Sequence, residues 1–217
     1  MNRPAAIFDV DHTLLPRRSL ESMFVRHLLF SGELGARDAS RSLRLVLKHA
    51  GKIPLARILK ENKAYLRGRA AAPFYARCRK WVLGTAVQRI PAAARRAVET
   101  QRAEGSVLVL LTGALDSLAE PLGEYLDMDI VLATRLAVED GRLTGTFVPP
   151  HPYGEGKWAI LLPVVEARGI DLSRSHAYAD SSADLAVLER VGHPHVVRPG
   201  RRMRAIAERR GWNIQMW

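Results

Sequence analysis

A short apolar run that leads directly into two acidic residues constrains the fold of this chain more than any other feature. Residues 5–8 are all apolar, as in a buried strand, and Asp9 and Asp11 follow at once. Side chains two positions apart on an extended backbone point the same way, so both carboxylates are expected together at the carboxyl end of a strand. In an open α/β sheet, this edge is where ligands bind.

Asp9 and Asp11 together predict a cation site. Two acids held close to each other repel, and a cation or a shared proton relieves this repulsion. A hard divalent ion such as Mg²⁺ takes oxygen ligands and keeps positions for water or phosphate oxygens. With such an ion present, one carboxylate can attack phosphorus while the other handles a proton. The simpler alternative is that the two acids cap a turn after the strand.

The chain from residue 91 onward predicts an α/β fold. Strands and helices alternate there, which indicates a parallel, Rossmann-like sheet with right-handed crossovers. The pair Asp140-Gly141 predicts a hairpin between 134–139 and 142–148. Strands are predicted at 107–111, 130–132, 175–179 and 195–197, and helices at 91–104, 117–126, 157–168, 185–191 and 201–210.

A helical segment separates the first strand from the others. Residues 17–90 show apolar positions at helical spacing and no β alternation. We therefore predict a helical cap domain at 17–90, inserted into a catalytic core that consists of 1–16 and 91–217. Helices in this segment are predicted to begin near Ser19, at Asp38 or Ser40, at Pro54 and at Pro73.

Charge divides the chain at nearly the same place. Residues 17–96 hold 19 Lys and Arg against 4 Asp and Glu, a net charge of +15, and the remainder holds 14 against 18, a net charge of −4. This asymmetry supports a boundary between two bodies. A cap with such a charge is expected to attract an anionic substrate or an anionic surface.

Composition limits the setting in which the protein works. The single cysteine, Cys78, excludes an internal disulfide and is consistent with a reducing compartment. No apolar run approaches the roughly 20 residues that span a bilayer. Charged residues interrupt the N-terminal stretch before a signal-peptide pattern develops. We therefore predict a cytoplasmic protein.

Polar residues recur where later strands end or helices begin, namely Thr112, Lys157, Asp180 and Asp184. Together with Asp9-x-Asp11-x-Thr13, they resemble the four motifs of the haloacid dehalogenase superfamily in order and context. The resemblance is greatest to the phosphoserine-phosphatase-like branch, subfamily IB, whose C1-type helical cap is inserted between the first two motifs. It covers essentially the whole chain and implies a Rossmann-like core with an α-helical cap.

The resemblance implies catalytic roles for particular residues. Asp9 would be the nucleophile and form an aspartyl-phosphate, which divides hydrolysis into two easier steps. Asp11 would protonate the leaving oxygen and then activate the water that releases phosphate. Thr112 and the backbone N–H of Gly113 would hold phosphoryl oxygens, and Lys157 would balance their negative charge.

The resemblance also implies a magnesium site. Asp180 would bind Mg²⁺ together with Asp9 and the main-chain carbonyl of Asp11. Asp184 would stand behind this site and orient either Lys157 or a metal-bound water.

Each later motif residue has an ordinary alternative when it is taken singly. Lys157 fits a solvated charge, Thr112 fits a helix N-cap, and both Asp180 and Asp184 fit caps of the following helix. The functional interpretation is favoured because all of these groups fall at strand or helix ends within one chain.

Departures from the pattern of the branch disfavour phosphoserine as the substrate. Where phosphoserine phosphatases hold the substrate's ammonium with a glutamate, an ungapped alignment places Arg18, which would repel an ammonium and attract an anion. The fourth motif has Ser181, Ser182 and Ala183 in place of a glycine-rich stretch with asparagine. The predicted activity is Mg²⁺-dependent hydrolysis of a small anionic phosphometabolite other than phosphoserine.

Two further functions are carried as alternatives. Some relatives in this branch act on phosphatidylglycerophosphate, and apolar residues among arginines at 23–30 are compatible with a lipid-phosphate phosphatase on an anionic membrane. The same stretch fits an ordinary helix of the cap core. The last alternative is a basic nucleic-acid-binding module without catalysis, which is disfavoured because no helix-turn-helix or aromatic platform is evident.

Overall fold

A parallel six-stranded sheet forms the centre of the computed structural model, which describes residues 2–35, 38, 40, 44 and 63–217. The strand order is β3-β2-β1-β6-β7-β8, and every neighbouring pair is parallel. This confirms the predicted Rossmann-like sheet. The strands are β1 (Ala5–Phe8), β2 (Val107–Leu115), β3 (Ile130–Thr134), β6 (His176–Ala179), β7 (His193–Val197) and β8 (Asn213–Gln215).

Helices cover both faces of the sheet because its strands are apolar on both sides. On β1, Ala6 and Phe8 belong to one buried cluster, whereas Ala5 and Ile7 belong to the other. The first cluster includes apolar side chains from α5 (Ala92–Ala103) and α6 (Asp116–Tyr125). The second includes those of α7 (Glu155–Arg168), α8 (Leu185–Leu188) and α9 (Arg201–Arg210).

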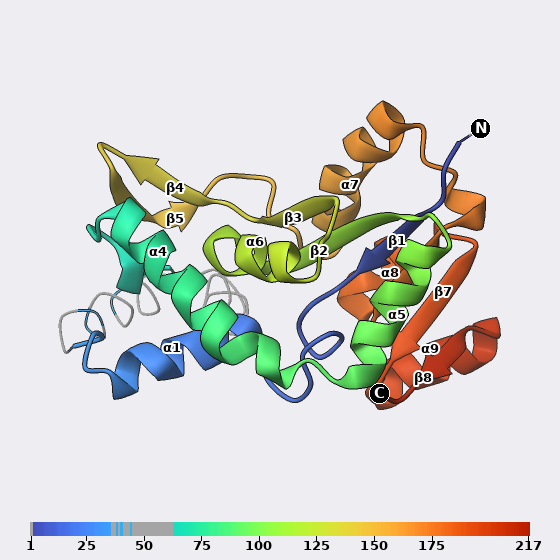
Figure 1. Ribbon diagram of the computed structural model, residues 1–217, viewed down its shortest axis with the longest axis horizontal. Coiled ribbons are helices and arrows are strands. Elements are labelled where there is room, and N and C mark those ends of the chain that lie inside the picture. Colours follow the sequence, from blue (N-terminus) through green and yellow to red (C-terminus); the bar gives the residue numbers. More distant parts are fainter. Residues whose placement is uncertain (1, 36–37, 39, 41–43, 45–62) are drawn as a thin grey trace.

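Helices α1 (Leu20–Phe30) and α4 (Ala71–Trp81) lie together at one end of the molecule (Figure 1). The side chain of Ser19 caps α1, as the sequence predicts, by accepting a hydrogen bond from the Ser22 N–H. The Phe24 ring packs against Trp81, with 5.1 Å between the ring centroids. Short turns precede and follow α4 at Ala64–Leu66, Val82–Ala86 and Val87–Arg89.

Two of the predicted cap helices cannot be compared with the structure. Those expected to begin at Asp38 or Ser40 and at Pro54 fall largely or wholly outside the described residues. The helix expected to begin at Pro73 is α4, which starts two residues earlier, at Ala71. The division of the chain into a cap domain at 17–90 and a core of 1–16 and 91–217 stays a prediction.

The predicted hairpin is present as β4 (Leu136–Glu139) and β5 (Arg142–Phe147). Its two turn residues have positive φ angles, 48° for Asp140 and 70° for Gly141, as a two-residue turn of this kind requires. The hairpin is separate from the main sheet. It lies against the chain before α4, where the Gly68 N–H donates to the Leu143 carbonyl at 2.8 Å. The sequence does not predict this contact.

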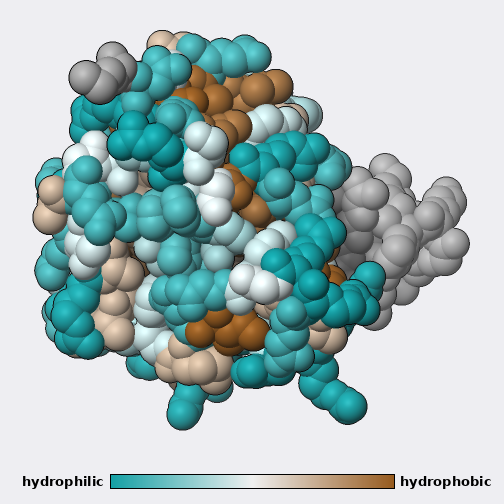
Figure 2. Space-filling model, turned by 90° about the vertical axis from the view of Figure 1, so that its right-hand side faces the viewer, coloured by the Kyte–Doolittle hydropathy of each residue, from teal (hydrophilic) through white to brown (hydrophobic). Residues whose placement is uncertain are grey.

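The surface at the opposite end of the molecule from α1 and α4 is mostly hydrophilic and carries a few separate hydrophobic patches (Figure 2). Among the helices in the described part of the chain, none combines the length and the apolar character that crossing a bilayer demands.

Candidate active site

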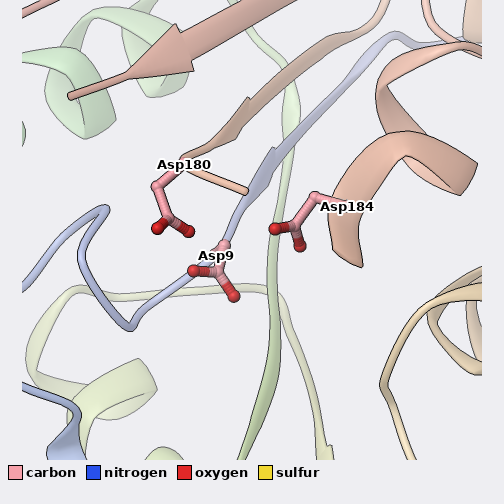
Figure 3. A group of neighbouring side chains, drawn as sticks. All are labelled: Asp9, Asp180 and Asp184. Atoms are coloured by element: carbon pink, nitrogen blue, oxygen red, sulfur yellow. The ribbon is translucent and has the colours of Figure 1, made fainter. Parts of the chain in front are cut away.

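Three carboxylates converge at the carboxyl edge of the sheet (Figure 3). Asp9 follows β1, Asp180 follows the neighbouring strand β6, and Asp184 lies directly before α8. One oxygen from each of the three lies within 4.8 Å of the others. Parallel strands end at the same edge of a sheet, so the pairing of β1 with β6 brings together residues that are far apart in sequence.

Lys157 lies between two of these acids. Its Nζ is 2.6 Å from Oδ1 of Asp9, and it also pairs with Oδ1 of Asp184. The side chain of Lys157 is 5% exposed, so the alternative of a solvated charge is wrong. Asp184 occupies the N-cap position of α8 without capping it, and instead accepts from Lys157 and from the Ser181 hydroxyl.

A close approach of backbone to backbone places Lys157 in the first turn of α7. A Cβ on Gly156 would come within 2.1 Å of the His151 carbonyl oxygen, so only glycine allows this packing. Gly154 precedes the helix with a φ of 58°. In the sequence Gly154-Glu155-Gly156-Lys157, the first glycine therefore allows the positive φ angle and the second allows the close contact with His151.

The carboxylates of Asp9, Asp180 and Asp184 together carry more negative charge than Lys157 neutralises. Burial raises the pKa of Asp9, and it raises the pKa of Asp180 to about 6 with a further contribution from the charge of Asp184. Burial alone would lower the pKa of Lys157, but the Asp184 and Asp9 carboxylates raise it. One ammonium against three acids leaves a site that favours a bound cation.

Asp11 has a different environment from the other three acids. Its Oδ1 accepts a hydrogen bond of 2.8 Å from the N–H of Leu20, the first residue of α1. Burial raises the pKa of Asp11. Its side chain lies outside the group of Asp9, Asp180 and Asp184, but it lines the same cavity. Asp11 therefore connects the acidic site to α1.

Thr112 and Gly113 lie within β2, which continues to Leu115 and is longer than predicted. Thr112 is fully buried, and its Oγ1 accepts from the Ala114 N–H at 3.1 Å. Leu115 occupies the N-cap position of α6, so the alternative role of Thr112 as that cap is wrong. Gly113 lines the cavity, and its carbonyl accepts from the Thr134 hydroxyl at 2.8 Å.

A cavity of about 800 Å³ lies above the acids. Its floor includes Asp9, Asp11, Lys157, Asp180 and Asp184. Its described wall comes mainly from α1 and two loops and includes Glu21, Ser22, Val25, Arg26, Leu29, Tyr65, Pro152 and Tyr153.

Arg18 is exposed and is absent from the described lining of this cavity, so its role in substrate selection stays a prediction without support from the geometry. Arg26, one turn and a half into α1, lines the cavity instead. The signal that sequence reasoning missed is the helical spacing of Ser22, Val25 and Leu29, which places them on one stripe of α1.

Arg198, which follows β7, is a second residue that sequence reasoning missed. Its guanidinium donates to the carbonyl of His12 at 2.8 Å and to that of Thr13 at 2.7 Å. The Trp217 indole N–H also donates to the Thr13 carbonyl, at 3.3 Å. These contacts hold the loop that follows Asp9 and Asp11, where His12 has a φ of 63°.

Comparison with known proteins is consistent with this geometry. A family model described as haloacid dehalogenase-like hydrolase matches residues 6–189. The "Inhibition of morphological differentiation protein" of Streptomyces azureus is 40% identical over 118 residues, which are 54% of this chain and 42% of that protein. Phosphoserine phosphatase SerB1 of Mycobacterium tuberculosis is 27% identical over 216 residues, which cover 97% of this chain and 70% of that protein.

A solved structure shares the fold across the whole chain. It is a protein with unknown function from Bordetella pertussis Tohama I, with a TM-score of 0.85 and 24% identity over 99% of both chains. The match to the Streptomyces azureus protein spans only about two fifths of that relative's length.

Proposed function

Because the chain belongs to the haloacid dehalogenase-like hydrolase family, we propose that it is a phosphatase that hydrolyses a phosphomonoester through an aspartyl-phosphate on Asp9. The observation that carries this proposal is the contact between the Asp9 carboxylate and Lys157 in a group of three acids, of which Asp9 and Asp184 are buried. The relative SerB1 is named a phosphoserine phosphatase, which supports phosphatase activity in this chain.

The acidic group fits a magnesium ion. Three carboxylate oxygens, each from a different side chain, lie within 4.8 Å of one another, and hard divalent cations prefer such ligands. We propose that Asp9, Asp180 and the main-chain carbonyl of Asp11 hold Mg²⁺, with Asp184 as support. When bound, the ion would neutralise charge on the phosphoryl group and on the nucleophile.

The residues of this chain divide the chemistry between them. An Asp9 oxygen forms a bond to phosphorus while the bond from phosphorus to the ester oxygen breaks, and Asp11 gives that oxygen a proton. Asp11 then takes a proton from the water that attacks the phosphoryl group, which frees Asp9 and inorganic phosphate. Lys157 balances the charge on Asp9 throughout.

The phosphoryl oxygens need donors as they move. Gly113 lines the cavity, and we propose that its backbone N–H donates to a phosphoryl oxygen. Thr112 is fully buried and is not among the described residues that line the cavity. Its hydroxyl accepts from the Ala114 N–H, and we propose that its own proton is donated to a phosphoryl oxygen.

The residues of the cavity wall support the proposal that the substrate is a small anionic phosphoester other than phosphoserine. Glu21 lines the cavity and is a glutamate that could bind the ammonium group of phosphoserine. Both of its carboxylate oxygens, however, already accept hydrogen bonds from Nζ of Lys63, at 2.6 and 2.5 Å. Arg26 lines the same cavity and favours an anion.

The two alternative functions have less support. Phe24 and Leu28 are buried in the core, so much of the apolar stretch at 23–30 is the ordinary helix that the sequence also allows and not a membrane-binding face. Membership of a hydrolase family argues against a nucleic-acid-binding module without catalysis.

A phosphatase screen tests the proposal. We expect the protein to release phosphate from p-nitrophenyl phosphate and from a panel of phosphorylated metabolites in Mg²⁺, and to lose this activity in a chelator. Equal activity with and without the chelator would contradict the metal assignment, and no release from any ester would contradict the phosphatase.

A further inference from the structure

Helix α1 presents two different stripes. Leu20, Phe24 and Leu28, spaced four residues apart, are fully buried in the core. The neighbouring stripe carries Ser22, Val25, Arg26 and Leu29, and all four line the cavity above the acids. The helix therefore acts as a wall of the active site as well as a part of the core.

Two large apolar side chains are left exposed in this wall. Leu29 is 58% exposed and Tyr153 is 51% exposed, and both line the cavity together with Val25, Pro152 and Tyr65. Exposed apolar surface inside a cavity is typical of a site where a ligand covers it. The wall thus offers contact area for an apolar part of the substrate.

Arg26 provides a positive charge beside this apolar surface. Its guanidinium lies 5.2 Å from the centre of the Phe30 ring, and no carboxylate of a described residue forms an ion pair with it. A guanidinium supported by an aromatic ring keeps its hydrogen-bond donors available to an anion. The other charge of α1 in the cavity, Glu21, is already bonded to Lys63 and to the Tyr65 hydroxyl.

We propose that the substrate is a phosphomonoester whose leaving group has an apolar segment and a second anionic group. The inference rests on the phosphatase function proposed above and assigns the substrate class of the same site. The phosphoryl group binds over Asp9, the apolar segment packs on Val25, Leu29 and Tyr153, and the second anion pairs with Arg26.

Three matched esters test this assignment. They are the phosphate monoesters of hexanol, of ω-hydroxyhexanoic acid and of ω-aminohexanol, which differ only in the neutral, anionic or cationic group at the far end. We expect kcat/KM to be highest for the carboxylate ester, about tenfold above the alkyl ester, because a charge-assisted hydrogen bond contributes an energy of this size. The amino ester should be the poorest substrate.

Two variants test whether residues of the cavity wall cause the preference for the carboxylate ester. Arg26→Gln should reduce the ratio of kcat/KM between the carboxylate and alkyl esters to near one, and Leu29→Asn should lower kcat/KM for the carboxylate and alkyl esters alike by about fivefold. Arg18→Gln, an exposed arginine outside the described lining, is the matched control and should keep the wild-type ratio.

The outcomes separate this inference from the phosphatase proposal. Hydrolysis of p-nitrophenyl phosphate with equal use of all three esters, or a preference for the amino ester, would overturn the substrate class and leave the phosphatase intact. A preference that persists in Arg26→Gln would also overturn it. Hydrolysis of p-nitrophenyl phosphate with no hydrolysis of the three alkyl esters would likewise overturn the substrate class alone, whereas no hydrolysis of any of the four esters would refute the phosphatase.

Discussion

The Nζ atom of Lys157 lies 2.6 Å from Oδ1 of Asp9, although the two residues are 148 positions apart in the chain. The same ammonium also pairs with Asp184. Lys157 therefore joins the end of β1 to the beginning of α7 and to the segment before α8.

Asp9→Asn should abolish turnover while preserving the fold. The amide is nearly the same size as the carboxylate but is not a nucleophile, so kcat for p-nitrophenyl phosphate should fall by at least about a thousandfold. Lys157 keeps Asp184 as its partner, so the melting temperature should change little. Asp140→Asn is the matched control, because asparagine is also favoured in that hairpin turn. Retained activity in Asp9→Asn would refute the nucleophile assignment.

Mg²⁺ should stabilise the folded protein through the acidic group. A ligand at ten times its Kd adds about 1.4 kcal/mol to the free energy of unfolding, which is about 3–5 °C in Tm for a chain of this size. Asp180→Asn removes one proposed ligand and should reduce this shift by at least half. Thermal unfolding in Mg²⁺ and in chelator measures both effects. A full shift in Asp180→Asn would place the ion elsewhere.

Arg198 should act as a positioning residue for the loop after Asp11. Arg198→Ala removes the donors to the His12 and Thr13 carbonyls, so kcat should fall about tenfold while KM changes less than twofold. Arg198→Lys should recover part of kcat because it restores one donor. Arg201→Lys, at an exposed position in α9, is the control. If Arg198→Ala lowers Tm but leaves kcat intact, its role is structural only.

Acid should weaken the edge of the sheet around His195. Its Nε2 lies 3.0 Å from Nδ1 of His176, and burial, followed by the charges of His176 and His193, lowers the pKa of His195 to about 4 from an ordinary 6.5. Between these two pKa values the unfolded chain binds more protons than the folded one, so stability falls as pH decreases from 6.5 toward 4.

Denaturant unfolding at pH 7 and pH 5 measures this effect. Because His195 is partly solvated, we expect its contribution to the loss at pH 5 to be about 1 kcal/mol. His195→Gln cannot be protonated, so its stability should change less between the two pH values than that of the wild type. An equal change in the two proteins would show that another group dominates.

Local sequence patterns predicted most of the elements because their causes are local. The apolar run of β1 and the acids that follow it are adjacent in the chain, and the Asp140-Gly141 turn needs only two residues that accept positive φ angles. By contrast, β8 was missed. Its residues, Asn213 to Gln215, lack the apolar run that marks a strand, and β8 is an edge strand that pairs only with β7.

The candidate site was predicted less evenly. Asp9, Asp180 and Asp184 were each placed at the end of an element, and the structure brings them together. Arg18 was selected by an ungapped alignment, which assumes no insertion or deletion between Asp9 and α1, whereas Arg26 of α1 is the arginine that lines the described cavity. Arg198 has no motif, so its contact with the His12 carbonyl is visible only in the fold.

The sequence alone determined where strands end and which of those ends carry acids, a lysine or a turn, because these properties depend on neighbouring residues. The tertiary structure decided which of those groups meet and which arginine of two enters the cavity. Such contacts depend on the order of the strands and on how α1 is packed, and residues 148 positions apart have no local interaction through which the chain could encode their distance.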